Sequence, residues 1–197
     1  PDHSAEALEA AQHRKIETLL SRLALSDGDK LLEIGCGWGG LAEVALRADN
    51  IHYHGITLSS EQKVYADERL MGLGDASVTL TDYRDVAGQY DAIASVEMVE
   101  AVGQQYWPDY LKSVARCLKS GGRAAIQYIR IEDDVFESYA RGTDFIQHYI
   151  FPGGMLLSES RFRAIAADCG LSWEDQHDFG LHYAETLRHW RMRFDAA

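Results

Sequence analysis

Three glycines at alternate positions, Gly35, Gly37 and Gly39, directly follow an apolar run that ends in Glu33-Ile34. Glycine adopts backbone dihedrals that other residues avoid, and it lets a ligand lie against bare backbone. Residues 41–47 are expected to be helical, so the unpaired N–H groups and the positive end of this helix face the same ligand. The pattern predicts a buried strand, a tight ligand-binding turn and a helix.

The spacing of these glycines indicates which ligand to expect. It is Gly-x-Gly-x-Gly rather than Gly-x-Gly-x-x-Gly, and no Gly-Lys-Ser/Thr follows, so a phosphate cradle is less favoured. Glu33, just before Gly35, suits a ligand with a cationic ammonium group, such as S-adenosylmethionine. A dinucleotide and a glycine-rich turn without any ligand remain the alternatives.

Polar residues that can bind the rest of such a cofactor follow the next two expected strands. Thr57 and Gln62 can hydrogen-bond a ribose or an adenine, although Ser59 or Ser60 there can equally be an ordinary helix cap. Asp82-Tyr83 offers a carboxylate and an aromatic ring, although aspartate is common in such turns. The complete set of predicted cofactor contacts is Glu33, Gly35, Cys36, Gly37, Gly39, Thr57, Leu58, Gln62, Asp82 and Tyr83.

Two glutamates and an aromatic segment mark a second part of the site. Glu97 and Glu100 lie three residues apart after an apolar strand, where burial can perturb a carboxyl pKa, or they form a solvated pair at a helix start. Residues 144–154 are unusually apolar and aromatic for a connection. We interpret them as a lid or acyl-chain tunnel, with a core-capping loop as the alternative; His148 favours a structural role.

Strands and helices of regular length alternate along the chain and place these residues. Alternation of this kind predicts a doubly wound α/β fold with a mostly parallel sheet, in which ligands bind beyond the carboxyl ends of the strands. Residues 132–157 have no clear period and are expected to form an insertion. Besides the strand before Gly35, the expected strands are 51–58, 77–81, 90–96, 123–131 and 171–179, and the expected helices are 4–25, 41–47, 59–70, 106–118 and 158–169.

Length and composition bound the protein's class. The 197 residues predict a single domain, 1–197. Nineteen basic and 31 acidic residues give a net charge of −12, which argues against nucleic acid and against strong attraction to anionic lipid. Three cysteines in unrelated contexts and the absence of an apolar run of ~20 residues predict a reduced, cytoplasmic protein. Transient contact with the inner face of the membrane is left open. No metal site is predicted, and the oligomeric state is left open.

Five blocks of the sequence share a pattern with known proteins: 31–40, 55–62, 95–103, 144–154 and 182–190. Together they resemble one family, the cyclopropane fatty-acid and mycolic-acid cyclopropane synthases. The glycine motif alone suits any class I, Rossmann-like methyltransferase, whereas blocks 55–62, 144–154 and 182–190 are more specific and extend the resemblance over nearly the whole chain.

The resemblance implies a reaction and a set of roles. An alkene in an unsaturated acyl chain takes the methyl group of S-adenosylmethionine, a bound bicarbonate removes a proton, and a cyclopropane ring closes. By position, Glu100 and Tyr183 resemble the residues that bind bicarbonate, Ile129 resembles a backbone contact to it, and Glu33 supports the methionine end of the cofactor.

This chain also departs from the family pattern. Gln127 stands where the synthases have the histidine of the bicarbonate pocket, so it is expected in the catalytic site with Glu100, Tyr183 and Ile129. Glutamine can hydrogen-bond an anion but cannot carry a proton at neutral pH. Ala101 replaces a histidine that commonly follows the glutamate. The family's Tyr-Ser-Cys block, expected before Ser4, and its last helix and final strand, expected after Phe194, are not in this sequence.

These departures leave several functions open. We expect methyl transfer to an acyl chain that yields a cyclopropane or, given Gln127, a methyl or methylene branch. A methyltransferase acting on a hydrophobic small molecule, with Glu100 as an ordinary base, is the second hypothesis. A protein that binds cofactor or lipid without turnover is the third.

Overall fold

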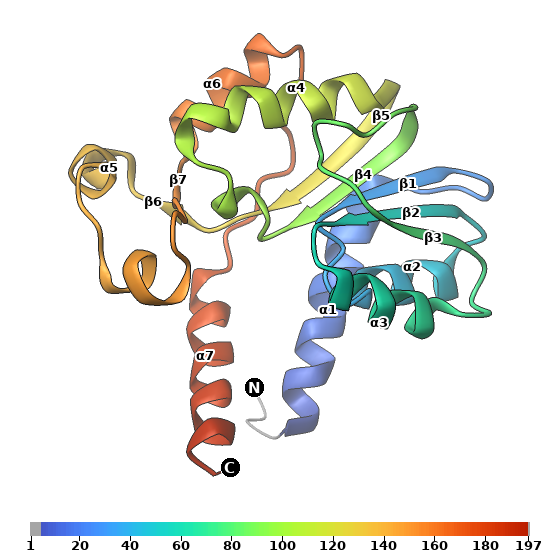
Figure 1. Cartoon of the computed structure of the whole chain (residues 1–197), viewed down its shortest axis with the longest axis horizontal. Helices are drawn as coiled ribbons and strands as arrows, with labels where there is room; N and C mark the ends of the chain where they lie inside the picture. Colours follow the sequence, from blue (N-terminus) through green and yellow to red (C-terminus); the bar gives the residue numbers. More distant parts are fainter. Residues whose placement is uncertain (1–4, 197) are drawn as a thin grey trace.

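The computed structural model describes residues 5–196, and its centre is a five-stranded parallel sheet with helices on both faces (Figure 1). The strand order is β3-β2-β1-β4-β5, so the order reverses between β1 and β4. This confirms the predicted doubly wound α/β fold. The strands are β1 (Lys30–Ile34), β2 (His52–Thr57), β3 (Asp75–Leu80), β4 (Tyr90–Val96) and β5 (Leu118–Gln127).

Successive residues of the central strands face two separate cores. Leu31 packs in the core beneath α1 (Ala5–Leu23), α2 (Gly40–Ala48) and α3 (Ser60–Leu70), whereas Leu32 packs beneath α4 (Trp107–Cys117) and α6 (Glu159–Asp168). Both leucines are fully buried. A strand covered on both faces is continuously apolar, which explains why these strands were recognisable in the sequence.

Strand β5 begins earlier than expected. Gly121 and Gly122 belong to an irregular stretch of β5, because Tyr90 pairs with Leu118 but Ala92 pairs with Arg123. A Cβ atom on Gly122 would lie 2.6 Å from the carbonyl oxygen of Asp91, so only glycine allows this close approach.

The predicted strand 123–131 ends at Gln127. Beyond it, β6 (Arg130–Ile131) leaves the main sheet and pairs with β7 (Leu157–Ser158). Between β6 and β7, the insertion contains α5 (Asp133–Ala140) and a π-helical turn, Ile146–Ile150.

The predicted strand 171–179 is wrong. Leu171 and Trp173 pack against the second core, but residues 174–178 are exposed and the segment is irregular. A large cavity is lined on one side by this segment and on the other by β5, which is the last strand of the main sheet among residues 5–196. The segment therefore has no adjacent strand to take its backbone hydrogen bonds.

The segment leads into α7 (Gly180–Asp195), which runs away from the sheet on the same side as α1 (Figure 1). No helix within residues 5–196 has both the length and the apolar character needed to cross a membrane.

Candidate active site

The turn after β1 is built from glycines with left-handed backbone conformations. The φ angles of Gly35, Gly37 and Gly39 are +81°, +52° and +77°. A Cβ atom on Gly35 would lie 2.7 Å from Met98 Cγ, whereas one on Gly37 would meet no atom within 4 Å. The turn therefore requires glycine at its start and presents open backbone in its middle, as the sequence predicts for a ligand-binding turn.

The carboxyl group of Glu33, two residues before the turn, is buried in the core next to it. Glu33 is 3% exposed, and its Oε2 accepts a 2.6 Å hydrogen bond from the Tyr53 hydroxyl. Burial raises the pKa of Glu33 to about 8, although the Tyr53 bond acts in the opposite direction. Cys36 is buried beside them, and burial together with the charge of Glu33 raises its thiol pKa to about 12. The side chain of Cys36 thus belongs to the core rather than to the open face of the turn.

Strand β2 ends in a polar cluster that lies next to the glycine turn. The Thr57 hydroxyl donates to Gln62 Oε1 at 2.7 Å, which leaves the amide nitrogen of Gln62 to donate elsewhere. Ser59 caps α3 by accepting from the N–H of Gln62, so the capping interpretation holds for this serine. Leu58, 77% exposed, lies at the surface between them.

The residues after β3 are held in place by Arg84. Its guanidinium donates to both carboxylate oxygens of Asp82, at 2.8 and 2.7 Å, and these bonds hold the pKa of Asp82 below its usual value. The ring of Tyr83 packs edge-on against Tyr110, with 5.6 Å between the ring centroids. Asp82 is therefore a fixed anion, and Tyr83 a fixed ring, at the carboxyl edge of the sheet.

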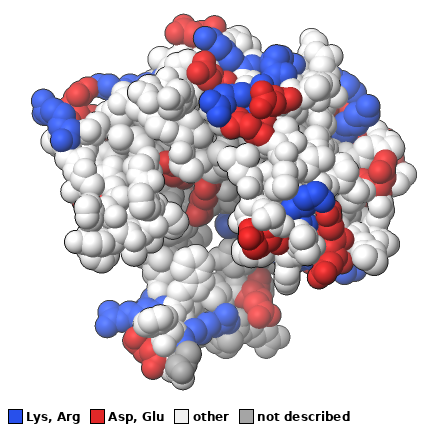
Figure 2. Space-filling view, in the orientation of Figure 1, with Lys and Arg blue, Asp and Glu red and all other residues white. Residues whose placement is uncertain are grey.

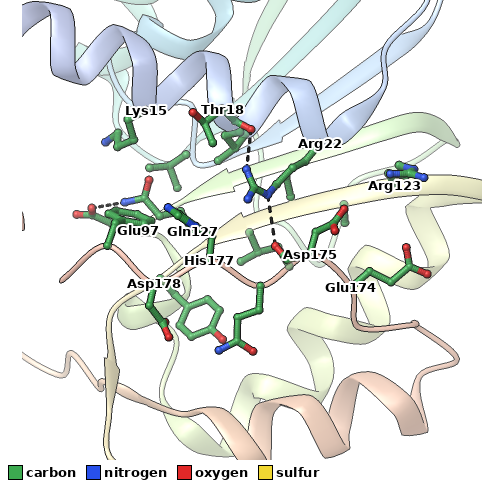
Figure 3. Close-up of a pocket in the computed structure, with 18 of the residues that line it drawn as sticks. Lys15, Thr18, Arg22, Glu97, Arg123, Gln127, Glu174, Asp175, His177 and Asp178 are labelled. Carbon is green, nitrogen blue, oxygen red and sulfur yellow. Dashed lines mark hydrogen bonds between the residues drawn. The ribbon is translucent and has the colours of Figure 1, made fainter. Parts of the chain in front are cut away.

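Glu97, directly after β4, joins two of the predicted catalytic residues. Its Oε1 accepts a 2.6 Å bond from Gln127 Nε2 (Figure 3). Its Oε2 accepts a 3.1 Å bond from the Tyr183 hydroxyl. Desolvation and the charge of Glu97 raise the pKa of Tyr183 to about 12. The resemblance connects Tyr183 with Glu100, whereas in the structure the phenol donates to Glu97.

Glu100 lies beside this group, and only one of its two carboxylate oxygens has a hydrogen-bond partner among the described residues. Its Oε1 accepts the backbone N–H of Ile129 at 2.5 Å, while its Oε2 is buried without a hydrogen-bond partner among the described residues. Burial raises the pKa of Glu100 to about 6, and Glu97 contributes to that rise. The charge of Glu100 in turn contributes to the raised pKa of Tyr183, so the three groups share one site.

The insertion is fastened to this site by its backbone. The N–H of Met155 donates to the carbonyl of Glu100 at 2.8 Å, and the N–H of Leu157 donates to the carbonyl of Ile129 at 3.2 Å. His148 is exposed and packs edge-on against the ring of Tyr149. The tip of the insertion exposes five large apolar side chains: Phe145, Ile146, Tyr149, Ile150 and Phe151.

Charged side chains are scattered over the visible face of the molecule, with acidic and basic groups interspersed (Figure 2). Among residues 5–196, no three His, Cys, Asp or Glu side chains gather in a group that could hold a metal ion.

Comparison with known proteins identifies the family. The family model described as mycolic acid cyclopropane synthetase matches residues 2–197. The chain belongs to this family. Its relatives include the tuberculostearic acid methyltransferase UfaA1 of Mycobacterium tuberculosis, 42% identical over 95% of this chain, and the cyclopropane-fatty-acyl-phospholipid synthase of Escherichia coli, 38% identical over 98%. The resemblance stated from the sequence is thereby confirmed.

Solved members of the cyclopropane synthase family share the fold. The structure of the mycolic acid cyclopropane synthase CmaA1 in complex with SAH and CTAB has 26% sequence identity and a TM-score of 0.88. That match covers 95% of this chain and 70% of CmaA1. This chain spans about half the length of the curated relatives named above, 44% and 49%.

Proposed function

We propose that this chain carries the methyltransferase domain of an enzyme that transfers a methyl group from S-adenosylmethionine to the double bond of an unsaturated fatty acyl chain. The family membership and the names of both relatives support this reaction class. The observation that carries the proposal is that the glycine turn after β1 and the carboxylate of Glu97 after β4 lie at the carboxyl edge of one parallel sheet. Gln127 at the end of β5 and Tyr183 of α7 are hydrogen-bonded to Glu97 there.

The residues at this edge fit S-adenosylmethionine. The open backbone at Gly37 can receive the methionine part, since a side chain there would meet no neighbouring atom. Thr57 and the free amide nitrogen of Gln62 can bind the ribose, and the ring of Tyr83 offers a face to the adenine. When bound, the cofactor supplies an electrophilic methyl group.

The other half of the site suits an acyl chain that becomes cationic. Methylation of an alkene leaves positive charge on the neighbouring carbon, and the carboxylates of Glu97 and Glu100 lie where they can stabilise it. The apolar insertion is bonded to the backbone of Glu100, so a chain held by the insertion would reach this site. Loss of a proton from the cation would give a cyclopropane or a methylene branch.

Exposed aromatic side chains on the insertion also support transient contact with a membrane surface. Phe145, Tyr149 and Phe151 are 66%, 68% and 68% exposed. Aromatic side chains insert favourably at the boundary between headgroups and acyl chains, which would bring a phospholipid substrate to the site.

The test is incubation of the full-length protein with methyl-labelled S-adenosylmethionine and mixed unsaturated phospholipids, followed by mass spectrometry of the acyl chains. We expect label in acyl chains that have gained one carbon. A product containing only rings would exclude branching. Label found only in an added small molecule, or in nothing, would overturn the proposal.

A further inference from the structure

The resemblance assigns Tyr183 to a bicarbonate ion, and Gln127 stands where the family has the histidine of that pocket. Both side chains are already hydrogen-bonded to a carboxylate of the chain itself. Gln127 donates to one oxygen of Glu97 and Tyr183 donates to the other. A carboxylate and a bicarbonate present the same planar pair of oxygens, so one carboxylate can occupy both donors. The side chain of Glu97 therefore fills the place in which a bicarbonate would be recognised.

The backbone of Glu97 adopts a strained conformation at the end of β4. Its φ angle is +50°, a conformation that residues other than glycine rarely adopt. Its N–H donates to the carbonyl of Gln127 at 2.9 Å, which ties the end of β4 to the end of β5. Strained residues of this kind concentrate at functional sites.

The electrostatics of the site also disfavour an added anion. Glu97 and Glu100 already place two carboxylates together, and their mutual repulsion contributes to the raised pKa of Glu100. A bicarbonate would be a third acidic group competing for donors that are in use. The residues present do not fit bicarbonate.

We propose that Glu97 is the proton acceptor of the reaction and that this enzyme works without bicarbonate. The inference rests on the proposed methyl transfer and names the base for it. Gln127 cannot accept a proton at neutral pH, and the phenol of Tyr183, whose pKa is raised to about 12, stays protonated and serves as a donor. Both residues therefore orient the carboxylate of Glu97.

The step balances as a simple proton transfer. After methylation, the carbon next to the newly methylated one carries the positive charge. A C–H bond of the added methyl group breaks, its proton goes to a Glu97 oxygen, and its electron pair closes the ring on the cationic carbon. If a hydride has first shifted onto that cationic carbon, the charge lies on the methylated carbon, and the same pair forms a methylene double bond there instead. Glu97 then releases the proton to water.

The activity test uses the full-length protein with labelled S-adenosylmethionine and unsaturated phospholipid vesicles, in buffer stripped of carbon dioxide. We expect the wild-type rate to be the same with and without added bicarbonate. Glu97→Gln should lower the rate by about 100-fold or more while cofactor affinity is retained. Glu68→Gln, on the exposed face of α3, controls for the loss of one negative charge. A wild-type rate that depends on bicarbonate, or a Glu97→Gln variant that keeps the wild-type rate, would overturn the proposal.

Binding of ¹³C-labelled bicarbonate, followed by NMR, gives a readout that does not depend on turnover. The wild type should show no saturable binding. Glu97→Gly frees both donors and suits a φ of +50°, so this variant should fold, bind bicarbonate and regain part of its rate when bicarbonate is added. Saturable binding to the wild type would overturn the inference. An absence of methylation under every condition would instead count against the proposed function.

Discussion

The phenol of Tyr53 on β2 donates a 2.6 Å hydrogen bond to the buried carboxyl group of Glu33, two residues before the glycine turn begins. Room for this contact comes from Gly55, where a Cβ atom would lie 2.5 Å from the Tyr53 hydroxyl and 2.9 Å from Cys36 Cβ. A hydrogen bond between side chains of the neighbouring strands β1 and β2 thus lies directly before the backbone that is proposed to bind the cofactor.

Removing this hydrogen bond should weaken both folding and cofactor binding. Tyr53→Phe leaves the buried carboxyl of Glu33 without its partner, which costs about 1–3 kcal/mol in the free energy of unfolding. Urea unfolding and calorimetric titration with S-adenosylmethionine measure the two effects. Tyr149→Phe, at an exposed tyrosine of the insertion, is the control and should change neither quantity. Equal stability of the two variants would show that the Tyr53 contact contributes nothing.

Glu33 should also make stability depend on pH. Its pKa is raised by burial from 4.5 to about 8, so the folded chain holds this proton more tightly than the unfolded chain. Stability from this group is therefore complete below about pH 4.5 and is lost as the pH rises to about 8. Glu33→Gln removes the effect. The free energy of unfolding of this variant, relative to that of the wild type, should therefore increase by roughly a few kcal/mol between about pH 5 and about pH 9. A difference that stays constant over this range would contradict the burial argument.

The requirement for glycine at the start of the turn can be isolated with a pair of variants. Gly35→Ala combines a φ of +81° with a 2.7 Å clash against Met98, whereas Gly28→Ala has a φ of +85° and no atom within 4 Å. Both variants carry backbone strain of about 1 kcal/mol or more. Only Gly35→Ala should lose S-adenosylmethionine binding as well, measured by calorimetry. Equal binding by both variants would place the cofactor elsewhere.

The sequence predicts the fold well where local patterns decide it. The apolar strands, the glycine turn and the helices that follow each strand are read from periodicity, because buried parallel strands and amphipathic helices have distinct patterns. The prediction of a strand at 171–179 was wrong for a reason that lies outside the segment itself. Alternating apolar residues such as Leu171 and Trp173 satisfy the pattern, but a strand also needs a neighbour, and no local signal reports whether one is present.

The residues of the candidate site could be predicted from the sequence, but the hydrogen bonds between them could not. Position after a strand end located Glu97 and Glu100, since parallel strands bring such residues to one edge. Gln127 lies within the predicted strand 123–131, and the family resemblance drew attention to it. The pairing of Tyr183 with Glu97 depends on where the first turn of α7 lies relative to the end of β4, 86 residues earlier in the chain. The left-handed backbone of Glu97 also left no trace in the sequence, where a glycine would have signalled it.

Glu100 should be needed for turnover but not for binding the cofactor. In Glu100→Gln the remaining carbonyl oxygen can still accept the N–H of Ile129, so the local fold is kept. The negative charge that would face the developing cation is lost, and we expect the rate to fall by about 100-fold or more. S-adenosylmethionine affinity should be unchanged. The wild-type rate should also decline below about pH 6, where Glu100 takes up a proton. A Glu100→Gln variant with full activity would show that Glu100 has a structural role only.

The aromatic tip of the insertion should control access to membrane-bound substrate. Phe145→Ser combined with Phe151→Ser removes two side chains that are 66% and 68% exposed, so folding and S-adenosylmethionine affinity should be kept. A phenylalanine fully buried in lipid contributes about 1.5–3 kcal/mol, and partial insertion contributes less, so the loss of both should weaken vesicle binding by about tenfold or more. Co-sedimentation with unsaturated phospholipid vesicles measures this, and Met71→Ser, at a methionine 78% exposed on the far end of α3, serves as the matched control. Vesicle binding that falls equally in both variants would mean that general surface hydrophobicity, rather than the tip of the insertion, attaches the protein to the membrane.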